Sequence, residues 1–190
     1  MKHIMVDLET LGTVADAVIL SIGAVKFDID SDAFDDNGFY ASVSVDSNLE
    51  LNRRIQEDTL VFWMGQEPAA QKVFHEPKNT LRSALEDFSD WVDGDNYSMW
   101  SNGADFDLPM LAHAFTQCRL DIPWKFWNSN CFRTYKKLPQ AKSVTFVPNG
   151  VKHNAMADAV NQAKHLQMIH AVVTGRVPQK VSSMIKVAQA

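Results

Sequence analysis

A long apolar segment near the start of the chain, residues 17–27, constrains the fold more than any other feature. It contains one charged residue, Lys26, among mostly aliphatic side chains, so it predicts a mostly buried β-strand. A strand is also expected over residues 3–8, and an acidic turn over 28–37 leads to a third strand near 39–45. The chain therefore opens with three strands, most simply an antiparallel meander.

Helices and one further strand follow this meander. The expected elements are a helix-rich stretch over 56–93, a short strand over 96–101, a helix over 106–118, a short helix around 131–138 and a long helix over 155–174. Asp105 stands where it can cap the first amides of the third of these elements, and Gly175 ends the last one. The order predicts an α/β protein with a mixed sheet.

Composition indicates one compact domain. The chain has 190 residues, of which 46% are hydrophobic, so we expect a single domain over 1–175 and a loosely attached tail over 176–190. No signal peptide, membrane-length apolar run or disulfide framework is visible, which predicts a reduced cytoplasmic protein without membrane association. The net charge of −5 argues against a protein that coats duplex nucleic acid, although an enzyme that grips a strand end remains compatible with it.

Two carboxylates, Asp7 and Glu9, stand two positions apart on the first expected strand. Because the side chains of a strand alternate between its faces, both point to the same side and lie next to each other. Two adjacent negative charges are unfavourable without a cation, so the pair is a candidate metal site. An exposed strand edge or a turn explains most such pairs, and the pair alone does not separate these interpretations.

A second group of acids follows the short strand at 96–101. The sequence from Asn102 to Asp107, NGADFD, falls where the strand gives way to a helix, and α/β sheets tend to carry ligands at this end of their strands. One interpretation is a capped helix start. The other has Asp105 as the cap while Asp107 points inward to a site.

The third group is His153 and Asp158, which are five positions apart. Five residues of a helix turn through about 500°, so both side chains cannot face one site from a single regular helix. A consistent arrangement places His153 in the loop before the last helix, Asn154 at its N-cap and Asp158 one turn inside. Without the other two groups, His153 would be interpreted as an exposed loop histidine.

Together, Asp-x-Glu on the first strand, Phe-Asp at a mid-chain helix and His-x-x-x-x-Asp near the end resemble the DEDDh 3′→5′ exonucleases, relatives of the proofreading subunit of bacterial replicative polymerases. The resemblance covers residues 4–170. It implies a ribonuclease H-like mixed sheet with helices on both faces. It also implies hydrolysis from the 3′ end of single-stranded nucleic acid with two divalent cations, Mg²⁺ or Mn²⁺, which would be held by Asp7, Glu9, Asp107 and Asp158.

The same resemblance implies further roles. Asp7 would bridge both cations, and His153 would accept a proton from the attacking water, for which an ordinary histidine pKa of about 6.5 is suitable. The matching positions for substrate contact are Thr10, Leu11, Gly12, Asn102 and Phe106. Leu11 is expected to pack against the terminal base.

A finer resemblance lies in two segments, residues 59–66 and Cys131 to Thr134, which look like the RNase AS-like branch that includes phage exonucleases. The aromatic pair Phe62 and Trp63 fits that branch, and Trp63 either faces the substrate or packs in the core. RNase AS-like features favour RNA and the phage relatives favour DNA, so the preferred sugar is left open. The branch also suggests a homodimer.

Three functions other than an exonuclease are alternatives for this sequence. A catalytically inactive nucleic-acid-binding or replisome-interaction module on the same fold conflicts with the presence of all five catalytic residues. A phosphatase with an aspartyl nucleophile would need a second aspartate where Glu9 stands. A purely structural protein would make the pattern of acids and histidine accidental.

Overall fold

The computed structural model describes residues 2–94 and 96–176 and contains a five-stranded sheet in the order β3-β2-β1-β4-β5. The strands are β1 (His3–Thr10), β2 (Ile19–Phe27), β3 (Phe39–Ser42), β4 (Ser98–Ser101) and β5 (Ser129–Cys131). The first three pair antiparallel, whereas β4 pairs parallel with β1 and with β5. The predicted meander and mixed sheet are therefore confirmed.

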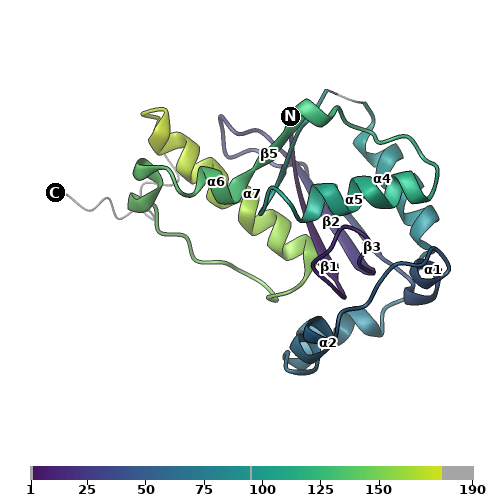
Figure 1. Cartoon of the computed structure of the whole chain (residues 1–190). Coiled ribbons are helices and arrows are strands. Elements are labelled where there is room, and N and C mark those ends of the chain that lie inside the picture. The colour runs from purple at the N-terminus through teal and green to yellow at the C-terminus, as the bar shows by residue number, and fades with distance from the viewer. Residues whose placement is uncertain (1, 95, 177–190) are drawn as a thin grey trace.

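Helices cover both faces of the sheet, as Figure 1 shows. The long helix α7 (Ala155–Val173) lies across one face, and α4 (Leu81–Val92) and α5 (Asp107–Gln117) pack on the other. The remaining helices are α1 (Val45–Leu49), α2 (Glu57–Met64), α3 (Pro68–Gln71), η1 (Lys72–Phe74), η2 (Phe126–Asn128), α6 (Phe132–Tyr135) and η3 (Pro139–Ser143). Every helix that the structure describes is too short or too polar to cross a membrane.

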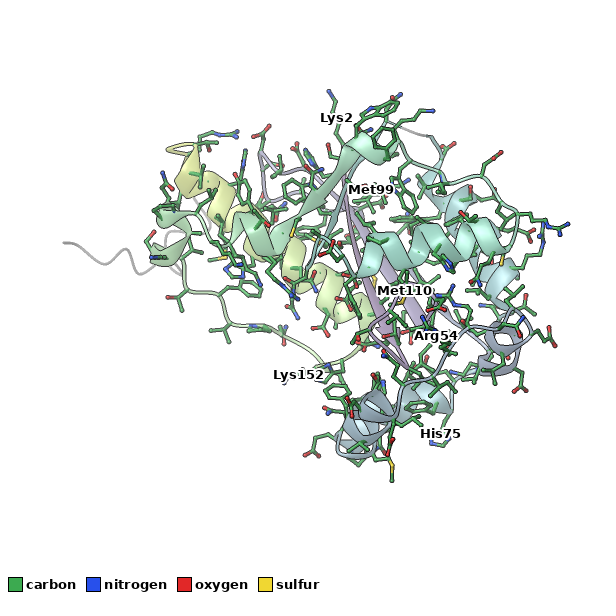
Figure 2. The ribbon with its side chains drawn as sticks, viewed as in Figure 1. Lys2, Arg54, His75, Met99, Met110 and Lys152 are labelled. Carbon is green, nitrogen blue, oxygen red and sulfur yellow. The ribbon has the colours of Figure 1, made fainter. Side chains whose placement is uncertain are left out.

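The strand period of two explains how β1 serves both faces. Ile4, Val6 and Leu8 join the core cluster under α4 and α5, to which β4 and α5 add Met99 and Met110 (Figure 2). The alternate side chains of β1 point towards α7. Of these, Met5 is apolar, and Asp7 and Glu9 are acidic. The sheet therefore presents Asp7 and Glu9 to α7.

Gly23 allows α7 to begin very close to this sheet. A Cβ atom built on Gly23 would lie 2.2 Å from the carbonyl carbon of Ala155, the first residue of α7. No other residue type fits such a contact without a shift of the backbone. The close approach of strand and helix brings the start of α7 next to the acidic end of β1.

Three local predictions need correction. The third strand ends at Ser42 rather than near residue 45, because the side chain of Ser44 accepts a hydrogen bond from the Ser47 amide and starts α1. Asp105 does not cap α5, whose N-cap is Phe106 with no side-chain hydrogen bond. The edge strand β5 was not predicted. Of the expected tail over 176–190, residues 177–190 lie outside the described residues.

Candidate active site

The acidic end of β1 forms the floor of a cavity of about 660 Å³. Asp7 and Glu9 both line it, and Glu9 is only 7% exposed. Gln162 of α7 donates a hydrogen bond from its Nε2 to Asp7 Oδ1 over 2.6 Å. One carboxylate oxygen of Asp7 is therefore held in a fixed direction by a neutral donor.

The start of α7 brings the second part of the site. The Asn154 side chain accepts a hydrogen bond from the Ala157 amide and caps the helix, as predicted. His153 precedes the cap with a left-handed φ of 61°, and its backbone amide donates to Asp158 Oδ2 over 3.0 Å. This turn folds His153 back over Asp158. Ligand atoms of Glu9, His153 and Asp158 consequently lie within 4.8 Å of one another.

Asp107 is placed differently from the other three acids. It is the first residue of α5, is 2% exposed and lies outside the set of residues that line the cavity. Its Oδ1 accepts a hydrogen bond from the Leu8 amide over 3.1 Å. The charge of Asp107 nevertheless raises the pKa of Asp7 and of Glu9. Asp107 therefore lies beside β1, next to the Leu8 amide, and acts on the pKa values of the other acids from there.

Burial and mutual repulsion make the acids difficult to ionise. Burial and then the charge of Asp158 raise the pKa of Glu9 to about 8, and burial raises the pKa of Asp107 to about 7. The pKa of Asp7 is raised well above its ordinary value by burial and then by its three acidic neighbours. Burial also raises the pKa of Asp158. Divalent cations would relieve this repulsion, and hard cations prefer oxygen ligands, so this donor set fits Mg²⁺ or Mn²⁺.

Aromatic side chains from α2 form the wall beside His153. The Phe62 and His153 rings meet edge to face, with centroids 5.1 Å apart and an interplanar angle of 87°. Trp63 is 3% exposed and donates from its Nε1 to the Thr10 carbonyl oxygen over 2.8 Å, yet it also lines the cavity. Core packing and a cavity-facing position, treated as alternatives for Trp63, are thus combined in one residue.

The predicted substrate residues divide into two groups. Those that line the cavity are Thr10, Gly12, Trp63, Asn102 and Phe106. Leu11 is 3% exposed and belongs to a core cluster with Trp63, Val18 and Leu20. In this structure Leu11 is buried beside Trp63 and does not line the cavity, and its contact with the terminal base stays a prediction.

Two buried oxygen atoms in this cavity lack a donor among the described residues, Asn102 Oδ1 and Gln162 Oε1. Such an atom costs free energy unless a ligand or water donates to it. Gln162 is not among the site residues that the sequence predicts. Its spacing of four residues from Asp158 on the same helix was the available signal, since such pairs share one helical face.

Comparisons with known proteins agree with this geometry. Residues 2–170 match the family described as the 3'-5' exoribonuclease Rv2179c-like domain. An exodeoxyribonuclease of Enterobacteria phage T4 is 23% identical, over 70% of each chain.

Three solved structures share the fold at 14–18% identity. The nuclease domain of 3'hExo, a DEDDh family member bound to rAMP, has a TM-score of 0.59 over 87% of this chain and 90% of its own. Cell-death related nuclease 4 has a TM-score of 0.59 over 88% of this chain, and E. coli Exonuclease I in complex with a dA16 oligonucleotide has 0.60 over 96%. The chain spans 63% and 42% of the length of these last two proteins. These structures confirm the predicted ribonuclease H-like fold class.

Proposed function

The chain belongs to the Rv2179c-like 3′-5′ exoribonuclease domain family and is a nuclease, and from this premise we propose that it removes nucleotides one at a time from the 3′ end of single-stranded nucleic acid. The product is a nucleoside 5′-monophosphate. One observation carries the proposal: Asp7, Glu9, Asp158 and His153 line a single cavity. Carboxylates beside a histidine base are the groups that metal-assisted phosphodiester hydrolysis requires.

Asp7, Glu9 and Asp158 would hold two divalent cations, with Asp107 contributing from its position beside β1. Bound cations supply Lewis acidity toward the phosphate and the attacking water. The hydrogen bond from Gln162 leaves Asp7 Oδ1 with a further lone pair and fixes its direction. The pairing of β1 with β2, in which Asp7 lies opposite Gly23 and Glu9 opposite Ser21, fixes the backbone of the two acids.

His153 is the proton acceptor in this proposal. Its pKa is lowered by burial first and by Lys152 second, while Asp158 acts in the opposite direction. The ring is therefore neutral near pH 7 and has a free nitrogen lone pair for the proton of the attacking water. The edge-to-face contact with Phe62 and the backbone bond to Asp158 hold the ring over the acids. The water oxygen forms a bond to phosphorus as its proton moves to the ring, and the bond from phosphorus to the 3′-oxygen of the penultimate nucleotide breaks.

The terminal nucleoside would occupy the end of the cavity lined by Thr10, Gly12, Phe62 and Trp63. Aromatic rings accept any base by stacking, which suits an enzyme that acts on the backbone. Asn102 Oδ1, a buried atom that lacks a donor among the described residues, would accept a hydrogen bond from a sugar hydroxyl. The family description names RNA and the phage T4 relative is named for DNA, so the test includes both sugars.

The test uses 5′-labelled single strands of RNA and DNA with the same sequence, incubated with the wild type and with His153→Ala in Mg²⁺ or Mn²⁺. A ladder that descends from the 5′-labelled strand is expected for the wild type and is removed by EDTA. His153→Ala is expected to be slower by about 10²- to 10⁴-fold, the usual contribution of a general base. If neither strand is shortened with either cation, the inactive nucleic-acid-binding module becomes the better interpretation.

Two organisational expectations stay predictions. A single domain over 1–175 agrees with the extent of the family match but is not tested by it. The homodimer is checked by sedimentation equilibrium, because a mass near the 21.3 kDa of one chain would exclude it.

A further inference from the structure

The cavity extends well beyond the proposed catalytic residues. Its far end is lined by Phe132, Lys136, Phe146, Pro148 and His165, which come from α6, the loop before α7, and α7 itself. The proposed hydrolysis assigns no task to any of these residues. They are therefore candidates for contact with a part of the substrate that lies away from the scissile bond.

Helix α7 forms one continuous wall of the cavity. Asp158, Gln162 and His165 stand at positions i, i+4 and i+7, which share one face of a helix. Seven residues of helix rise by about 10 Å. A stacked strand advances by about 3.4 Å per nucleotide, so the wall between Asp158 and His165 is long enough for more than one nucleotide.

The far end carries an aromatic stack. The rings of Phe146 and His165 are nearly parallel, with an interplanar angle of 10° and centroids 5.0 Å apart. Phe132 meets His165 edge to face at 5.5 Å. Phe146 and His165 are only partly buried and both line the cavity. Partly exposed rings in a cavity offer a stacking surface that every nucleobase can use.

The charges at the far end fit a nucleic acid strand. Lys136 lines the cavity, and its Nζ lies 4.6 Å from the centroid of the Phe132 ring. Burial and then the charge of Lys136 lower the pKa of His165 to about 4. At neutral pH His165 is thus an uncharged ring beside a lysine, which provides a stacking surface and a phosphate partner next to each other.

The two ends of the cavity differ in their relation to the catalytic residues. Phe62, Trp63 and Lys152 lie beside His153, at the start of α7, and Figure 2 shows Lys152 on the loop that leads into that helix. His165 lies on the opposite side of Asp158, further along α7. A strand whose terminal nucleoside occupies the first end must therefore continue towards the second.

We propose that Phe146, His165 and Lys136 form a binding subsite for nucleotides on the 5′ side of the scissile phosphate. Phe146 and His165 stack on a base, and Lys136 pairs with a phosphate of the strand. This inference rests on the proposed exonuclease function and adds a length dependence to it. Substrates that reach the subsite bind more tightly than those that stop at the scissile bond.

The first test compares Phe146→Ala with Phe34→Ala. Both phenylalanines are partly buried and pack against the same core cluster, but Phe34 does not line the cavity. Michaelis constants are measured for an eight-nucleotide strand and for a nucleoside 5′-(p-nitrophenyl) phosphate, which has no 5′-side nucleotides. Phe146→Ala is expected to raise the KM of the strand about fivefold or more and to leave kcat/KM for the ester unchanged. Phe34→Ala is expected to change neither.

The second test concerns Lys136. The dissociation constant of a labelled eight-nucleotide strand is measured in Ca²⁺ by fluorescence anisotropy at several salt concentrations. Lys136→Gln is expected to lower the slope of log Kd against log salt by about 0.7, the value for one phosphate contact of a single strand. The neighbouring exposed Lys137, which does not line the cavity, provides the matched control Lys137→Gln.

These outcomes test the proposed subsite separately from the proposed exonuclease activity. A wild type that cleaves both substrates, with Phe146→Ala equal to Phe34→Ala on the strand, overturns the subsite and leaves the exonuclease intact. A wild type that cleaves neither overturns the proposed function, and the anisotropy of Phe146→Ala and Lys136→Gln then decides on the subsite alone. Equal losses on the ester and the strand would also overturn it, because they indicate general damage to the cavity.

Discussion

The two faces of β1 differ in chemistry and in their exposure to the cavity. Towards α4 and α5 the strand presents Ile4, Val6 and Leu8, all of them inside one apolar cluster. Towards α7 it presents Asp7, which is partly buried, and Glu9, which is buried, and both acids line the cavity. A single strand therefore supplies both an apolar core and a group of acids, on opposite sides of one layer of backbone.

The two faces of β1 carry residues with different roles in stability and activity. Apolar burial on the α4 and α5 face stabilises the fold in any buffer. The acids on the α7 face repel one another and are desolvated, so without cations they oppose folding at neutral pH. Changes on the first face should therefore affect stability, and changes on the second should affect catalysis and metal binding.

The largest effect is expected from Asp7→Asn. The substitution removes a charge from the centre of the acids while keeping an oxygen that can accept from Gln162, so activity should fall below detection and the metal-free protein should melt at a higher temperature. Nuclease assays and thermal unfolding in EDTA check both outcomes. Asp46→Asn, an exposed acid in α1, is the control and should change neither. A lower melting temperature for Asp7→Asn would contradict the division between the faces.

The reciprocal change is Phe88→Ala on the opposite face. Phe88 is fully buried and contacts the rings of Phe39, Phe115 and Trp124, so the cavity left by its removal should cost about 3–5 kcal/mol of unfolding free energy. Urea denaturation measures this cost. Activity per folded molecule should stay at the wild-type value, and a loss of kcat at low temperature would show that the two faces are coupled.

A smaller effect is expected from Gln162→Leu. Loss of the donor to Asp7 Oδ1 frees the carboxylate to rotate, and removal of such an orienting partner typically lowers metal affinity by about 10- to 100-fold. Titration calorimetry with Mn²⁺ gives the affinity directly. Gln167→Leu is matched to it, because Gln167 also lies on α7 and is buried, but it donates to the Asp28 carbonyl oxygen. Equal Mn²⁺ affinities for the two variants would exclude the role of Gln162.

The smallest effect is a pH dependence of metal-free stability. The pKa values of Glu9 and Asp107 in the folded state are about 8 and about 7, above their ordinary values. Below the ordinary pKa values of Glu9 and Asp107, both carboxyl groups are protonated and their contribution to stability is complete. This contribution is lost as the pH rises through the folded-state pKa values of about 7 and about 8. The melting temperature in EDTA should therefore fall between pH 5 and pH 8. When Mg²⁺ replaces EDTA, the increase in melting temperature should be larger at pH 8 than at pH 5. An equal Mg²⁺ shift at both pH values would count against cation binding by these acids.

Several parts of the site could not be predicted because they depend on contacts between distant segments. The hydrogen bond that the Asp107 carboxylate accepts from the Leu8 amide joins two elements 99 positions apart. The burial of Leu11 beside Trp63 likewise depends on how α2 packs. The strand β5 has three residues, Ser129 to Cys131, and no apolar alternation that would identify it.

The sequence alone determined the local geometry of the acids. A strand period of two places Asp7 and Glu9 on one side, and the spacing of His153 and Asp158 requires a loop followed by a helix, because backbone geometry fixes both patterns over a few residues. Only the tertiary structure decided which side chains meet across the cavity. Gln162 reaches Asp7, 155 positions away, because α7 packs closely over Gly23. Such contacts depend on how whole elements pack, and no local pattern encodes that packing.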